Sequence, residues 1–91
     1  MFRLITENTR RYAIEKLVSQ RFLACTYIDA RGLMNGRETP SLIVEIDDAE
    51  RLDVYNLAGE IARENDQQCV LVQEIDAKSC FIYQDERWEK L

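Results

Sequence analysis

The residues of this chain that could hold a metal ion are a group of five acids between positions 45 and 53. Carboxylate oxygens are the ligands that hard cations such as Ca²⁺ prefer. This group contains no glycine turn, and no bidentate acid follows it at the distance that a calcium loop requires. Acids are also stabilised at the positive end of a helix dipole. The group therefore predicts a solvated helix start rather than a metal site; its members are Glu45, Asp47, Asp48, Glu50 and Asp53.

The possible nucleophiles lack a partner base, because the sequence has three cysteines and no histidine. Without histidine, no thiol or hydroxyl has its usual activating base, and the common zinc sites are excluded. Cys25, Cys69 and Cys80 are odd in number and widely spaced, which argues against a disulfide framework. We therefore expect reduced thiols that fill apolar space, no cofactor, no metal and no enzymatic activity.

A turn-rich segment with two glycines, residues 32–36, precedes the most strand-like part of the chain. It does not resemble a phosphate cradle, because a strand and not a helix N-terminus follows it. Asn35 and Gly36 form a favoured turn pair, and the strand after them places Leu42, Val44 and Ile46 on one face. Polar groups near this turn, including Arg37, Glu38 and Ser41, are expected to approach the region of residues 65–68 and either satisfy one another or form a recognition surface.

Length and composition indicate one domain, residues 1–91, with 46% apolar and 32% charged residues. No apolar run approaches the ~20 residues that cross a bilayer, and a signal peptide is not evident, so we expect a cytoplasmic protein without a membrane partner. Residues 1–40 carry seven Lys or Arg against four acids, and residues 41–91 carry five against thirteen, so the net charges are +3 and −8. An acidic surface repels phosphates, so we do not expect nucleic-acid binding.

Hydrophobic periodicity predicts the elements that position these residues. We expect a strand over residues 2–5, with Thr6 as the N-cap of a helix over residues 7–20. Residues 22–28 are apolar on both faces and predict an interior strand. Residues 29–40 are expected to form a long hairpin connection to an antiparallel strand over residues 42–46. A capping-box-like start at Asp47 and Glu50 precedes a second helix that ends near Asn65 and Asp66. Its apolar stripe comprises Val54, Leu57, Ala58, Ile61 and Ala62.

The last third of the chain predicts a buried central strand over residues 69–72, a turn at Asp76, Ala77 and Lys78, and a strand over 79–83. Residues 87–91 form a short tail whose Trp88 needs a surface to lie on. The order is therefore β-α-β-β-α-β with an added C-terminal strand. This order predicts an α+β fold, a ferredoxin-like two-layer sandwich.

Three spaced patterns within residues 22–72 resemble a loose family of small uncharacterised proteins from bacteriophages and other mobile elements. They read Gly32-x-x-x-Gly36-x-Glu38-x-x-Ser41-x-x-Val44, then Leu57-Ala58, then Asn65-x-x-Gln68-x-Val70-Leu71. The resemblance implies an accessory protein that acts in the host cytoplasm. Such small acidic proteins often work by binding a host component.

The sequence is compatible with two functions of different classes. The first is a non-enzymatic acidic binding protein that docks on another protein and blocks a host defence complex. The second is a small-ligand regulatory module in which paired ferredoxin-like domains bind a metabolite through the backbone amides of the 32–36 turn. A homodimeric structural role is compatible with either. The candidate partner-binding residues are Glu50, Asp53, Glu60 and Glu64 on the second helix and Asn35, Arg37 and Glu38 at the turn.

Overall fold

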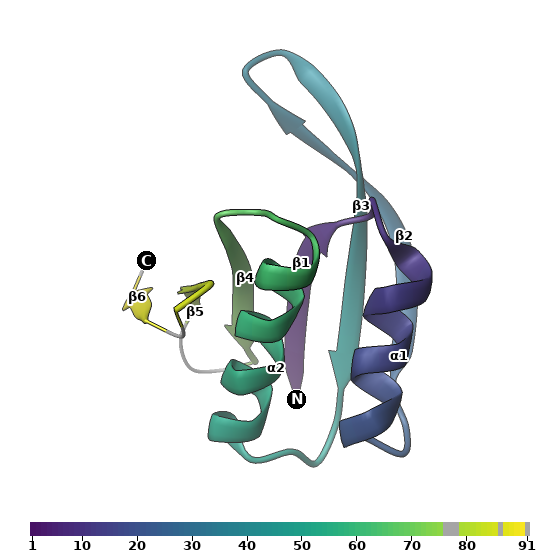
Figure 1. The fold of residues 1–91 in the computed structure, drawn as a ribbon, viewed down its shortest axis with the longest axis vertical. Coiled ribbons are helices and arrows are strands. Elements are labelled where there is room, and N and C mark those ends of the chain that lie inside the picture. The colour runs from purple at the N-terminus through teal and green to yellow at the C-terminus, as the bar shows by residue number, and fades with distance from the viewer. Residues whose placement is uncertain (76–78, 86, 91) are drawn as a thin grey trace.

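Two helices lie on one face of a six-stranded sheet (Figure 1). The computed structural model of the chain describes residues 1–75, 79–85 and 87–90. Along the chain the elements are β1 (Phe2–Glu7), α1 (Arg11–Arg21), β2 (Thr26–Met34), β3 (Arg37–Ile46), α2 (Arg51–Glu64), β4 (Cys69–Glu74), β5 (Ser79–Tyr83) and β6 (Trp88–Lys90).

The strand order across the sheet is β2-β3-β1-β4-β5-β6, and every neighbouring pair is antiparallel. This small α+β arrangement is compatible with the ferredoxin-like sandwich that the sequence predicts. The prediction of a C-terminal strand over 79–83 is confirmed by β5. The expected tail after it is wrong, because Trp88–Lys90 pairs with β5 as one more strand.

The core lies between the helices and the sheet. The stripe predicted for the second helix is confirmed, since its five apolar members are fully buried in α2. Leu42, Val44 and Ile46 of β3 are also fully buried, so the alternation that predicts this strand's inner face is correct. Val70 and Val72 face the same core from β4, which lies between β1 and β5 as a central strand.

The two ends of α2 agree with the sequence to different degrees. At the C-terminus Asn65 is the cap and Asp66 adopts φ +52°, as the predicted turn residues should. The amide of Gln67 donates to the carbonyl of Ala62 at 3.0 Å, so the end of the helix is closed by a Schellman motif. At the N-terminus the predicted capping box is wrong, because the helix begins only after Glu50 and no side chain caps it.

Thr6 does not cap the first helix. β1 runs two residues further than predicted, because Thr6 and Glu7 pair with Leu42 and Ser41 of β3. The chain then needs residues 8–10 to turn, and α1 begins at Arg11. The Thr6 side chain is consequently buried inside the fold.

The strand predicted over residues 22–28 is shifted and lies at an edge of the sheet, not in its interior. β2 begins at Thr26, and Leu23 in the preceding loop is fully exposed at 107% of its reference surface. Phe22, Cys25 and Tyr27 do pack against the core, which accounts for the apolar character of the segment. β3 has β1 on its other side, so β2 has one paired neighbour.

The expected long connection over residues 29–40 is also wrong, because strands fill it. Met34 pairs with Arg37 across a two-residue turn, in which Asn35 has φ +53° and Gly36 has φ +77°. Two positive φ angles define the type I′ turn, whose twist matches that of the flanking strands. The distal part of this hairpin, residues 30–40, projects beyond the sheet in Figure 1 and is called the arm below.

The turn predicted at residues 76–78 lies outside the described residues. Within the described part of the chain, neither helix is long and apolar enough to span a membrane.

Candidate functional site

The face of the sheet opposite the helices carries a continuous row of large apolar side chains. Ile28 pairs with Ile43, Ile43 with Ile5, Ile5 with Leu71, and Leu71 with Phe81. These five residues, called the apolar row, cross five adjacent strands at one level. Four of them are half-buried, and Ile28 at the edge is 38% exposed. Because both helices lie on the other face (Figure 1), this row forms an apolar surface that neither helix covers.

A polar row lies beside the apolar row on the same face. Arg3 pairs with Glu45 in register, and the Arg3 Nε donates to the Glu45 carboxylate at 2.6 Å. Thr26, Gln73 and Ser79 continue this row across β2, β4 and β5, as the strand registers place them. An apolar centre with a polar border is the usual composition of a protein-binding surface.

A hollow of about 310 Å³ lies on this face where the arm begins. Ile5, Leu71 and Phe81 of the apolar row line it, together with the acidic residue Glu7. A Cβ on Gly32 would lie 3.0 Å from the Ser41 hydroxyl, so only glycine fits there without a shift. The remaining lining residues are Thr6, Gly32, Leu33, Thr39, Ser41, Gln67 and Cys69.

A buried hydrogen-bond network closes the same end of the sheet. The Gln67 Oε1 accepts from the Thr6 hydroxyl at 2.8 Å and from the Glu7 amide at 3.3 Å, and the Gln67 Nε2 donates to the Cys69 carbonyl at 2.6 Å. The Asn65 Nδ2 donates to the Glu7 carbonyl at 3.1 Å and lies within hydrogen-bond distance of Thr6 and Gln67. These hydrogen bonds tie α2, β1 and β4 together, although the buried Asn65 Oδ1 has no partner within the described residues.

The polar groups that the sequence places at this end of the sheet separate into two sets. Ser41 and Gln67 line the same hollow, as expected. Asn35, Arg37 and Glu38 instead belong to the arm, where all three are exposed. The Arg31 guanidinium lies 3.5 Å from the Glu38 carboxylate, so part of the charge on the arm is paired.

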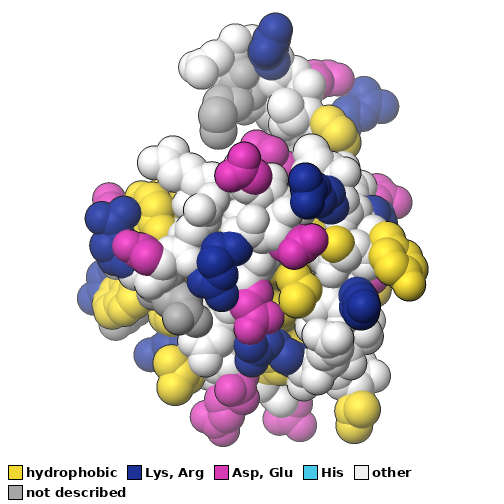
Figure 2. Space-filling model, in the orientation of Figure 1, with side chains coloured by type: hydrophobic (Ala, Val, Ile, Leu, Met, Phe, Trp, Pro, Cys, Tyr) yellow, Lys and Arg dark blue, Asp and Glu magenta, His cyan; other side chains and the backbone are white. Residues whose placement is uncertain are grey.

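The four candidate acids of α2 do not form a uniformly acidic surface. Glu50 and Asp53 are exposed near the start of the helix. Glu60 is half-buried and bonded to Arg21, and Glu64 lies 3.9 Å from Arg10. Figure 2 shows Lys and Arg side chains interspersed with Asp and Glu over the helical side of the molecule. The structure therefore neutralises part of the predicted acidic face with basic residues from the first half of the chain.

The cysteines offer little nucleophilic chemistry. All three are free thiols, and Cys80 is buried. Burial, reinforced by the negative charge of Glu89, raises the pKa of the Cys69 thiol, so it stays protonated at neutral pH. Within the described residues, no three His, Cys, Asp or Glu side chains converge as a metal site.

The apolar row was not among the features expected from the sequence, although the sequence contains a signal for it. Strands such as the one over residues 69–72 are apolar on both faces, and two helices cannot cover both sides of a sheet. The face without helices must then expose apolar side chains to solvent or to a partner.

Comparison with known protein families finds no matching family, and comparison with curated proteins finds no match either. Among solved structures, a phage SAM lyase in the apo state matches with a TM-score of 0.57 and 16% sequence identity. The match covers 99% of this chain and 86% of that chain. At this identity the likeness concerns the fold alone.

Proposed function

We propose that this protein acts by binding another protein, without catalysis, and that the apolar row is the centre of its docking surface. The observation that carries this proposal is the unbroken register of Ile28, Ile43, Ile5, Leu71 and Phe81 across five strands. Burying apolar area of this kind stabilises a complex by about 25 cal/mol for each Å² removed from water. The Arg3–Glu45 pair beside the row supplies a polar border that orients the partner.

We further propose that the protein is an accessory protein of a phage or another mobile element, and that its partner belongs to a host defence complex that it blocks in the host cytoplasm. The patterns around Gly32, Ser41 and Asn65 support this origin, and so does the similarity of the fold to a phage SAM lyase. In this proposal β1 to β4 with the two helices form a ferredoxin-like core, and β5 and β6 extend it.

The test compares single substitutions on three surfaces in capture of the partner from host lysate. Ile28→Lys changes the exposed end of the apolar row, Asp53→Lys the acidic start of α2, and Arg37→Ala the arm. Leu23→Lys is the matched control, because Leu23 is fully exposed and lies outside all three surfaces. A lysine at position 28 can keep its charged end in water, so the fold should tolerate it.

We expect Ile28→Lys to weaken capture by about tenfold or more, because it places a charge within the apolar docking surface, while Leu23→Lys retains capture. Melting temperatures of all variants should stay close to that of the wild type. If Ile28→Lys binds normally and Asp53→Lys abolishes capture, the acidic helix is the docking surface. If only Arg37→Ala abolishes it, the arm is.

A second candidate function follows from the hollow under the arm. Its lining combines apolar side chains with one acidic residue, Glu7, which suits a ligand with a flat ring and a positive charge. S-adenosylmethionine has both features, and the fold neighbour is a SAM lyase. Calorimetric titration with S-adenosylmethionine, and chromatography of the mixture after incubation, would test binding and turnover. If this second candidate function is correct, Glu7→Gln weakens the binding of S-adenosylmethionine. A titration that gives no binding heat would exclude this function.

A further inference from the structure

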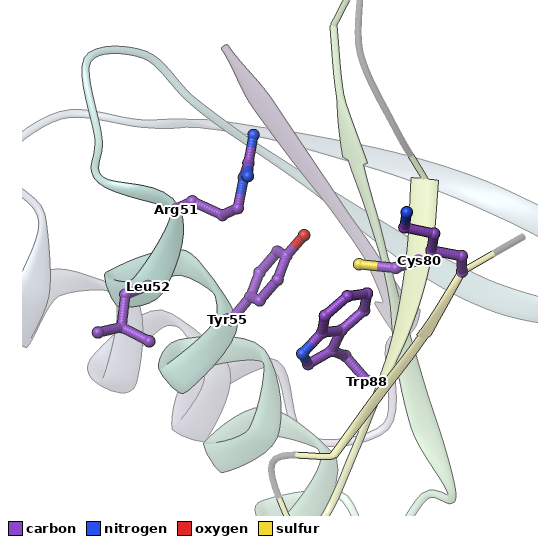
Figure 3. A pocket seen from close by; sticks show the side chains of 6 residues that line it. Arg51, Leu52, Tyr55, Cys80 and Trp88 are labelled. Carbon is purple, nitrogen blue, oxygen red and sulfur yellow. The ribbon is translucent and has the colours of Figure 1, made fainter.

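A second pocket of about 340 Å³ lies on the helical side of the molecule, between the first turns of α2 and the strands β5 and β6 (Figure 3). Its lining residues are Arg51, Leu52, Tyr55, Cys80, Trp88 and Lys90. Trp88 pairs with Ile82, whose side chain is buried in the core, so the pocket is on the opposite side of the sheet from the apolar row. The pocket is therefore separate from the proposed docking surface.

Two aromatic rings form the wall of this pocket. The centroids of Tyr55 and Trp88 are 6.4 Å apart and their planes are inclined by 46° (Figure 3). Trp88 is nevertheless 52% exposed, and neighbouring Leu52 is 69% exposed. The exposed indole offers a flat apolar surface on which an aromatic ring can stack, and Leu52 adds apolar area to the lining of the same pocket.

Two cations lie at the edges of the same wall. Arg51 donates from Nη2 to the Glu74 carboxylate at 2.8 Å, which fixes the position of its head group. Lys90, at the end of β6, contributes a second positive charge. The two positive charges of Arg51 and Lys90 and the one negative charge of Glu74 sum to one positive charge beside the aromatic surface. A pocket of this volume is large enough for a small ligand.

We propose that this pocket binds a flat aromatic ligand that carries an acidic group, the chemical class of the nucleoside monophosphates. The aromatic ring lies against Trp88 and Leu52, and the acidic group is held by Lys90 and the fixed Arg51. Both contacts are needed, because stacking supplies apolar burial and the cations supply a charge-assisted hydrogen bond.

The sole tryptophan of the chain is Trp88, so its fluorescence reports on this pocket directly. The experiment titrates the full chain with AMP as the probe and excites the indole selectively. Adenosine, which has the ring without the phosphate, and ribose 5-phosphate, which has the phosphate without the ring, are the comparison ligands. We expect a saturable change with AMP, about tenfold weaker binding of adenosine, and no saturable change with ribose 5-phosphate.

Two variants test the assignment of the residues. Lys90→Ala removes one of the two cations and should lower the affinity for AMP toward that for adenosine. Lys16→Ala, which removes an exposed lysine on α1, should leave the affinity unchanged. Leu52→Glu adds a negative charge at the pocket from α2, where Leu52 is exposed, and should weaken AMP binding. This variant leaves β6 unchanged, so it tests the pocket even if Lys90→Ala disturbs that strand. The proposal is overturned if AMP gives no saturable signal, if adenosine binds as tightly as AMP, or if Lys16→Ala lowers the affinity as much as Lys90→Ala.

Discussion

The side-chain amide of Gln67 joins elements that are far apart in the sequence. Its carbonyl oxygen accepts from Thr6 and Glu7 of β1, and its amide nitrogen donates to Cys69 at the start of β4. We expect Gln67→Ala to lower the free energy of unfolding by about 1–3 kcal/mol, because the buried Thr6 hydroxyl loses its acceptor. Urea denaturation measures this loss.

The matched control for that substitution is Gln68→Ala at the exposed neighbouring position. It should change the free energy of unfolding by less than about 0.5 kcal/mol, as surface substitutions usually do. If Gln67→Ala lowers the free energy of unfolding by no more than Gln68→Ala does, the network contributes no measurable stability.

Tyr55 predicts a dependence of stability on alkaline pH. Burial, and next the neighbouring Cys80 thiol, raise the pKa of Tyr55 from 10.0 to about 12. A group whose pKa is raised by folding stabilises the fold fully below its unfolded pKa and loses that contribution as pH rises through the folded value. The free energy of unfolding should therefore fall between pH 10 and about 12 by more in the wild type than in Tyr55→Phe. Parallel slopes in urea denaturation across this range would contradict the assignment.

At the scale of elements, α2 has the most clearly defined buried face. Leu57 is completely buried against the sheet, whereas Leu52 on the same helix is 69% exposed. We expect Leu57→Ala to lower the free energy of unfolding by about 2–5 kcal/mol and Leu52→Ala to change it by less than about 0.5 kcal/mol. Chemical denaturation of the two variants tests this, and a small effect at Leu57 would mean that another face of the helix is buried.

The elements that the sequence predicts well are those in which local pattern and burial agree. The stripe of α2 and the alternation in β3 from Leu42 to Ile46 both reflect contact with one core. The ends of elements depend on non-local contacts instead. Thr6 is a plausible helix cap by residue type, but its pairing with Leu42 extends β1 through it.

The arm and the edge position of β2 could not be deduced for related reasons. Residues 37–40 are exposed, so no apolar alternation marks them as a strand. Their pairing follows from the turn at Asn35 and Gly36, which the sequence does indicate as a turn pair. That an apolar strand lies at an edge depends on the strand order, which local patterns do not specify.

Considered as a whole, the described part of the chain places both helices, α1 and α2, on one side of a six-stranded sheet. The unequal charges of the two halves of the sequence partly mix in space, through contacts such as Arg21 with Glu60 and Arg10 with Glu64. Charge segregation along the chain therefore does not create one acidic surface. The more distinctive feature of the whole molecule is the uncovered apolar row with its polar border.

The two candidate ligand sites lie on opposite faces of the sheet. The hollow under the arm lies on the uncovered side of the sheet, whereas the pocket around Trp88 lies on the helical side. A partner protein docked on the apolar row would cover the hollow at Ile5 and leave Trp88 accessible. The two sites can therefore be studied independently in the intact chain.

Site-specific photo-crosslinking tests most directly whether the uncovered face of the sheet holds a protein partner. A photoreactive phenylalanine analogue at Phe81 lies in the apolar row, and the same analogue at Tyr12, which is 83% exposed on α1, lies on the helical side. We expect irradiation in host lysate to link a partner at position 81 and not at position 12. Crosslinking at position 12 alone, or at neither position while the partner still co-purifies, would contradict it.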